Sequence, residues 1–263
     1  MSSKDKELSK SKFKSFLKNA KNPPGTNDRC LRPEIEWELR PEQPVAQRCK
    51  ILKDLSEVHL QCCNLDENTI VKLWDVTKDL LVPTKSSECR QTALTFYKKL
   101  IHTQYKTLTY MREQFFLVIQ NHEVPEDLKH RLELLETLTE NGKDIKNLEE
   151  KIGRFMLQWL GAIHQANLLV PYLNMLVNLI KFNAAHLDNE IIIGIVTNAC
   201  NLSCSVSDEV IGIQCLSILE MVMSYTIFPS DPLPQFVFTL CRTVNIPPYC
   251  QASWKVSEND IFL

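Results

Sequence analysis

Glycine is scarce in this sequence, which has 6 Gly and 13 Pro among 263 residues. A glycine-rich phosphate-binding loop is absent, because neither GxGxxG nor GxxxxGK followed by Ser or Thr occurs. The prolines fall between apolar segments at roughly regular intervals, which is typical of helices joined by short loops. The chain is therefore expected to be all-α and to lack a nucleotide site.

Catalytic and metal-binding motifs are also missing. The sequence contains neither the HExxH motif of zinc proteases nor the GxSxG turn of serine hydrolases. Cys62 with Cys63, and Cys200 with Cys204, are not accompanied by a second pair at zinc-ligand spacing. We therefore expect no catalytic residue, no cofactor and no metal, and the chain is not expected to be an enzyme.

Neither sign of charge dominates, since the formal net charge is -2. Nucleic-acid binding depends on clustered Lys and Arg that neutralise phosphates, so no nucleic-acid partner is expected. The longest apolar stretch, residues 168–180, is interrupted by Pro171 and is shorter than the ~20 residues that cross a bilayer. No transmembrane segment is expected.

A secretion signal is not recognisable, because no positively charged start leads into an apolar run with a cleavage site. The 10 Cys are therefore expected to be reduced thiols, and the protein to be cytoplasmic. Cys200, Cys215 and Cys241 lie in apolar runs and are expected to pack as small hydrophobic residues.

The beginning of the chain is basic. Residues 1–21 hold seven Lys, with Phe13, Phe16 and Leu17 at helical spacing, which predicts a basic amphipathic segment. Such a segment either makes a weak contact with a membrane surface or a partner, or is a solvated terminus. Residues 22–43, which open with NPPGTND, are expected to be a linker.

From about residue 44 onward, signals for helix starts recur about every 20 residues. They fall near residues 46, 67, 87, 107, 125, 146, 168, 188, 207 and 232. A helix-pair period of about 40 residues is that of HEAT and armadillo arrays. Residues 44–263 are therefore expected to form an α-solenoid of helix pairs. A helix beginning near Ala252 and the apolar end at Leu263 suggest an array truncated at its C-terminal end.

Local chemistry supports individual helices. Asp66 and Asp188 are predicted N-caps, each preceded by Leu and followed four residues later by Ile, as in a hydrophobic staple. Residues 206–225 are apolar nearly all round, which predicts a helix buried among its neighbours.

Five polar residues in otherwise apolar helices are candidates for partner binding along a concave face. An alternative is that the two cations complement helix C-termini and that two of the asparagines act as C-caps. The candidates are Asn178, Lys181, Asn183, Arg242 and Asn245.

Several short strings, in the same order along the chain, resemble the N-terminal region of the tuberin family over about residues 60–255. They are EDLKHRLE at 126–133, LTENG at 138–142, FMLQW at 155–159, LVNLIKFN at 176–183 and TLCRTVN at 239–245. The resemblance implies an α-solenoid that binds the coiled coil of hamartin. It further implies a complex that stimulates GTP hydrolysis by the small GTPase Rheb and restrains TOR signalling, with a peripheral place at the lysosomal membrane.

The GTPase-activating domain of that family lies near the far C-terminus of a much longer chain, so no catalytic residue carries over to this sequence. We therefore expect a protein-binding scaffold, related to Rheb only through the full complex. The alternative is an unrelated helical-repeat adaptor in transport or cytoskeletal assembly.

Overall fold

A computed structural model describes residues 32–163, 165–205 and 207–258. The basic segment expected at residues 1–21 lies outside this range. The described residues form helices and connecting loops, with no strand among them. The described helices belong to two compact units, which divide between residues 134 and 135.

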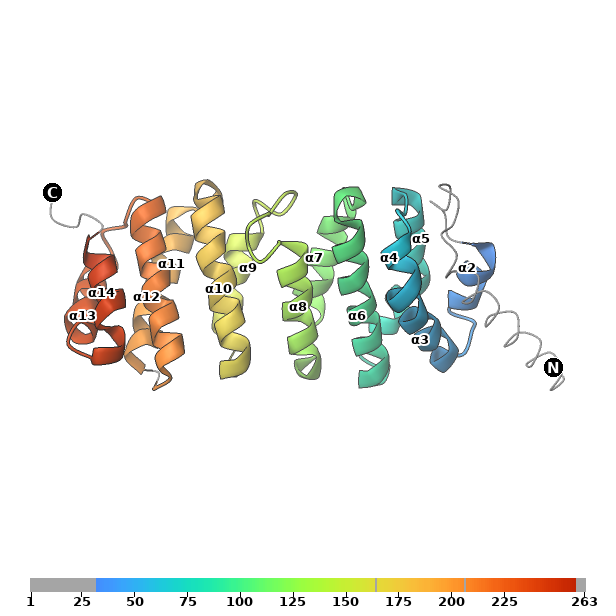
Figure 1. Cartoon of the computed structure of the whole chain (residues 1–263), viewed down its shortest axis with the longest axis horizontal. Coiled ribbons are helices and arrows are strands. Elements are labelled where there is room, and N and C mark those ends of the chain that lie inside the picture. The colour runs from blue at the N-terminus through green and yellow to red at the C-terminus, as the bar shows by residue number, and fades with distance from the viewer. Residues whose placement is uncertain (1–31, 164, 206, 259–263) are drawn as a thin grey trace. The chain divides into compact units, whose positions relative to one another are not determined.

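The first unit is built from pairs of helices. In it, α3 packs against α2 and α6, and α2 also packs against α5 (Figure 1). Short 3-10 turns extend three of the helices or lead into them, at Lys78–Leu81, Tyr105–Thr107 and Pro125–Asp127. The helices are α2 (Pro33–Leu39), α3 (Val45–Asp54), α4 (Leu60–Cys62), α5 (Glu67–Thr77), α6 (Ser87–Gln104), α7 (Met111–Asn121) and α8 (Leu128–Leu138).

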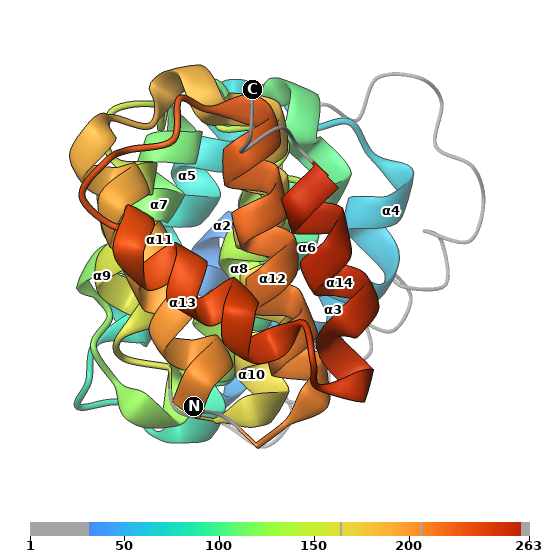
Figure 2. The ribbon, with the colours of Figure 1, turned by 90° about the vertical axis from the view of Figure 1, so that its left-hand side faces the viewer.

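The last residues of α8 belong to the second unit, where the helices pack in two layers. One layer has α12 between α10 and α14, and the other has α11 between α9 and α13. Figure 2 shows α13 and α14 side by side, nearest the viewer. The helices are α9 (Ile152–Leu160), α10 (Ala166–Asn183), α11 (Asn189–Ser205), α12 (Glu209–Tyr225), α13 (Leu233–Thr243) and α14 (Pro247–Glu258).

Both predicted N-caps are confirmed. Asp66 accepts a hydrogen bond from the Thr69 N–H at 2.8 Å, and Asp188 accepts one from the Ile191 N–H at 2.9 Å. These bonds satisfy donors that have no partner within the first turn of a helix. The predicted buried helix is also confirmed, because α12 packs on α10, α11 and α14.

Two boundaries differ from the sequence-based expectation. Part of the expected linker at 22–43 is the helix α2, whose Ile35 and Leu39 are buried. These two residues are spaced i, i+4 after Pro33, which gives the segment one apolar helical face. The loop-forming residues NPPGTND predicted a linker, and this spacing was not tested. The last helix begins at Pro247, five residues before the expected start near Ala252.

Of the three cysteines predicted to be buried, two are buried and one is exposed. Cys200 and Cys215 are buried as expected, and burial raises the pKa of Cys200 to about 11 and that of Cys215 to about 12. Cys241 is exposed instead, because α13 buries the opposite face, which carries Phe236, Thr239 and Thr243. Eight cysteines of the described part of the chain are free thiols, namely Cys49, Cys63, Cys89, Cys200, Cys204, Cys215, Cys241 and Cys250.

One described helical segment, Ala166–His186, is long and apolar enough to cross a membrane. The core helix of a soluble protein passes the same test of length and composition. Eight residues of α10 are buried, and the helix packs along α12. The apolar side chains of α10 therefore form part of the core of the second unit.

Candidate functional site

Two of the predicted partner-binding residues use their amide groups within the chain. The Asn178 Nδ2 donates to the Asn141 carbonyl oxygen at 2.9 Å. The Asn183 Nδ2 donates to the carbonyl oxygens of Gly142 at 2.9 Å and Lys143 at 3.1 Å. Both asparagines on α10 therefore hold the loop that follows α8.

The conformation of that loop depends on glycine. Gly142 has φ +83°, and a Cβ at this position would overlap the Met175 carbonyl oxygen on α10. Thr139 Oγ1 accepts a hydrogen bond from the Gly142 N–H at 2.9 Å. The LTENG and LVNLIKFN strings are thus the two sides of one contact.

The other three predicted residues are exposed. The Lys181 Nζ lies 5.6 Å from the centroid of the Phe182 ring, and the Lys143 Nζ lies 5.9 Å from the same centroid. Arg242 and Asn245 lie at the end of α13 and just after it. Because α10 and α13 belong to different layers, the five residues do not form a single ladder.

Among the buried arginines of the first unit, three that recur at the same helical position were missed by the sequence analysis. Arg48, Arg90 and Arg131 are each the fourth residue of a helix, namely α3, α6 and α8. Their spacings of 42 and 41 residues (90 − 48 and 131 − 90) match the expected pair period of about 40. Comparing the repeats with one another would have revealed them.

Each of these arginines donates hydrogen bonds to backbone carbonyls of the segment before its helix, and Arg48 also donates to a later helix. Arg48 donates to the Leu39 carbonyl oxygen from Nε and to the Val76 carbonyl oxygen from a terminal nitrogen, both at 2.8 Å. It also pairs with Asp79, and this hydrogen bond lowers the pKa of the Asp79 carboxyl. Arg131 donates to the Ile119 carbonyl oxygen at the end of α7. The guanidinium groups therefore satisfy carbonyls that the ends of helices leave free.

Arg90 is the centre of a buried network. Its Nε lies 2.6 Å from Asp127 Oδ2, which also lies 2.8 Å from His122 Nε2. Burial by itself raises the pKa of Asp127, but hydrogen bonds from Arg90, His122 and Gln91 outweigh that effect and lower it. The side chains of Arg90, His122 and Asp127 are at most 6% exposed, so this network is a structural element of the interior.

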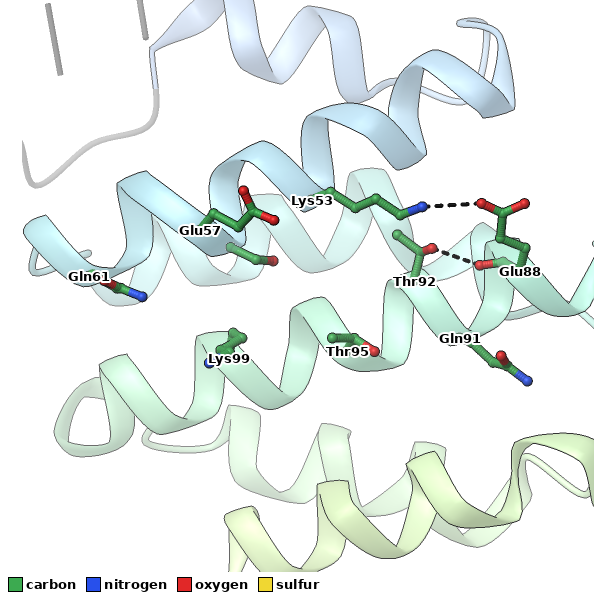
Figure 3. A pocket seen from close by; sticks show the side chains of 9 residues that line it. Lys53, Glu57, Gln61, Glu88, Gln91, Thr92, Thr95 and Lys99 are labelled. Atoms are coloured by element: carbon green, nitrogen blue, oxygen red, sulfur yellow. Dashed lines mark hydrogen bonds and ion pairs between the residues drawn. The ribbon is translucent and has the colours of Figure 1, made fainter. Parts of the chain in front are cut away.

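A groove of about 440 Å³ lies between α3–α4 and α6 in the first unit (Figure 3). One wall carries side chains at i, i+4 and i+8, and the other carries side chains of α6 from Glu88 to Lys99. The lining residues are Lys53, Ser56, Glu57, Gln61, Glu88, Gln91, Thr92, Thr95 and Lys99.

One wall of the groove contains a π-helical turn, Leu55–His59. Within it the Leu60 N–H donates to the Leu55 carbonyl, five residues back. A π turn takes an extra residue, widens the helix and changes the direction of the side chains that follow, and it is frequent at functional sites. Ser56 and Glu57, within this turn, both line the groove.

An ion pair closes one end of the groove. The Lys53 Nζ lies 3.1 Å from Glu88 Oε1, and Figure 3 shows this pair joining the two walls. Farther along, the side chains of four lining residues make no hydrogen bond or ion pair with the described residues. They are Glu57, Gln61, Thr95 and Lys99.

The side chains of the groove are groups that can bind another molecule. Among the described residues, no group of three His, Cys, Asp or Glu is placed to hold a metal ion. The groove presents a carboxylate, an ammonium, amides and hydroxyls, which are groups that form hydrogen bonds and ion pairs with another polypeptide. The fold and this groove define an all-α helical-repeat scaffold.

Comparison with known proteins gives the family. The profile described as "Domain of unknown function (DUF3384)" matches residues 45–259, and the chain belongs to this family. The solved structure of the N-terminus of TSC2, which is tuberin, is similar with a TM-score of 0.78 and 16% identity. That similarity covers 86% of this chain and 58% of the tuberin chain, so this chain spans less than two thirds of its neighbour.

Two engineered proteins share the fold more distantly. A designed armadillo repeat protein has a TM-score of 0.55 at 14% identity, over 86% of this chain and 98% of its own. Another engineered protein has a TM-score of 0.54 at 14% identity, over 87% and 96%. The predicted all-α solenoid and the predicted resemblance to the tuberin N-terminus are both confirmed.

Proposed function

We propose that this protein is a scaffold that binds the coiled coil of hamartin, as part of a complex that activates GTP hydrolysis by Rheb and restrains TOR signalling. The supporting observation is the fold shared with the tuberin N-terminus over 86% of the chain. The contact between the LTENG loop and α10 adds to it, because two of the tuberin-like strings meet there.

The protein acts, in this proposal, in the cytoplasm and at the periphery of the lysosomal membrane. The basic segment at residues 1–21 supplies a weak membrane contact, since Lys side chains are attracted to anionic lipid headgroups. Its link to Rheb is indirect, because the helical-repeat fold is that of a scaffold and not that of a catalytic domain.

A pull-down tests the proposal. The hamartin coiled coil is immobilised, and the purified chain is applied at low micromolar concentration in physiological salt. Retention of the chain, reversed by free coiled coil, is the expected result. Absence of retention for a chain with a full helical circular dichroism spectrum would instead favour the unrelated adaptor in transport or cytoskeletal assembly.

A further inference from the structure

We propose that the groove between α3–α4 and α6 binds an extended segment of a partner protein that carries one basic and one acidic side chain. The basic side chain faces Glu57 and the acidic one faces Lys99. This site goes beyond the proposed binding of hamartin, because a coiled coil is helical and the groove fits an extended chain.

The length of the groove sets the length of the segment. Its lining residues run from Lys53 to Gln61 on one wall and from Glu88 to Lys99 on the other. At 1.5 Å per helical residue, these walls are roughly 12 and 16 Å long. An extended chain advances about 3.3 Å per residue, so the groove accommodates about five residues.

The free charges of the groove set the chemistry of the segment. Lys53 and Glu88 neutralise each other at one end, whereas no ion pair joins Glu57 to Lys99. Glu57 therefore presents a carboxylate and Lys99 an ammonium to whatever enters. A ligand with both charges satisfies both residues, and a ligand with only one charge leaves the other residue unpaired.

A second observation points to a cation near Glu57. The neighbouring Asp54 has a buried Oδ2 with no hydrogen-bond partner among the described residues. Burial raises the pKa of Asp54, Lys50 lowers it, and the Glu57 carboxylate raises it. Because the two carboxylates repel each other, a guanidinium or ammonium bound at Glu57 relieves the repulsion at both.

The floor of the groove suits a peptide backbone. The Ser56 hydroxyl donates to the Leu52 carbonyl oxygen, and the Thr92 hydroxyl donates to the Glu88 carbonyl oxygen, as Figure 3 shows for Thr92. Each hydroxyl has thereby used its hydrogen and keeps its oxygen as an acceptor for a peptide N–H. The Gln61 amide supplies both a donor and an acceptor to backbone groups, which must be paired when they leave water.

Other ligands match the groove less well. An amphipathic helix inserts large apolar anchors into pockets of aliphatic and aromatic side chains, and no such side chain is among the nine that line this groove. Nucleic acid needs several cations in excess, whereas the charges of Lys53, Glu57, Glu88 and Lys99 sum to zero.

The test uses fluorescein-labelled nine-residue peptides of Gly, Ser and Thr that contain one Arg and one Glu. The charges are placed one to four residues apart in both orders, and binding to the full chain is followed by fluorescence anisotropy. At least one peptide is expected to bind with a Kd below about 100 µM. Its counterpart with Gln at both positions is expected to bind at least tenfold more weakly. If no peptide of the set binds, the proposal is overturned.

Charge exchange locates the bound peptide. Glu57→Lys and Lys99→Glu, both at exposed positions, are each expected to weaken the best peptide at least tenfold. The double variant is expected to bind the peptide in which Arg and Glu have exchanged places. The control pair Lys146→Glu and Glu150→Lys, exposed positions in the second unit, makes the same charge changes and is expected to leave binding unchanged. If the Glu57→Lys and Lys99→Glu variants bound the peptide as tightly as the unchanged protein, the assignment to this groove would be overturned.

A groove-filling variant separates this inference from the proposed function. Thr95→Trp, at an exposed lining position, is expected to abolish peptide binding and to leave retention on the hamartin coiled coil unchanged. Loss of hamartin binding in this variant would overturn the inference, because the coiled coil would then occupy the groove. Peptide binding by a chain that never binds hamartin would keep the inference and refute the proposed function.

Discussion

At the scale of single residues, the first unit depends on charged side chains that it has buried. Arg90 and Asp127 are almost fully removed from water, and each compensates the buried charge of the other. Arg90 also donates to the carbonyl oxygens of Lys85 and Pro83, so one guanidinium joins the loop before α6 to the start of the next helix pair. Removing either partner should therefore affect the whole unit.

The first prediction concerns this pair. Asp127→Asn keeps the size of the side chain but leaves the buried Arg90 charge with only the exposed Glu126 as a counter-ion, so the free energy of unfolding should fall by about 3 kcal/mol. Urea denaturation followed by circular dichroism measures the change. Glu126→Gln is the control, because the Glu126 side chain is 69% exposed and its pair with Arg90 should contribute less than about 1 kcal/mol. Equal effects of the two substitutions would contradict this ranking.

The second prediction concerns pH. The pKa of Asp79 is lowered by Arg48, and that of Asp127 is lowered by its three hydrogen bonds, relative to the ordinary value of 3.8. Below about pH 4 the unfolded chain therefore binds more protons than the folded one, and the free energy of unfolding falls as the pH falls. Above about pH 5 these two carboxyls contribute their full stability. Urea titrations at pH 7, 5, 4 and 3 should show this fall, and it should be shallower for Asp127→Asn.

At the scale of elements, the loop after α8 is defined by the helix on which it lies. Its residues Glu140, Asn141 and Gly142 have positive φ, and Asn178 and Asn183 of α10 bind its carbonyl groups. Because Gly142 approaches the α10 backbone closely, the loop can pack against α10 in this conformation only if residue 142 has no side chain.

The third prediction tests that requirement. Gly142→Ala adds a Cβ to a left-handed residue and against the Met175 carbonyl, so the variant should lose about 2 to 3 kcal/mol of stability. Gly161→Ala is the matched control, since its φ is -70° and the nearest atom to an added Cβ is 3.7 Å away. That control should change stability by less than about 1 kcal/mol. Thermal unfolding measures both, and a neutral Gly142→Ala would refute the proposed role of the close approach.

At the scale of the whole molecule, helix pairs depend on their neighbours for a core. In the second unit α10 packs on α12, and α12 packs on α14, so damage to one helix exposes the apolar face of the next. The stability of each pair is therefore tied to that of the adjacent pair.

The fourth prediction uses Leu179, a buried residue of α10. Leu179→Asp removes a core side chain and buries an unpaired carboxylate, which should cost about 5 kcal/mol and unfold the second unit. Circular dichroism should show the loss of helix, and hamartin binding should be lost with it. Lys143→Asp, at an exposed loop position, should alter neither. A Leu179→Asp variant that retained both signals would show that this position is not part of the core.

The sequence by itself determined the fold class, most helix starts and the burial of α12. These features follow from caps, apolar spacing and repeat period, which are properties of residues near one another in the chain. Only the tertiary structure decided what individual polar residues do. Asn178 meets Asn141 across 37 residues, Arg90 meets Asp127 across 37, and Lys53 meets Glu88 across 35. The groove depends on one π-helical turn and on the side chains that two helices bring together, so no local pattern specifies it.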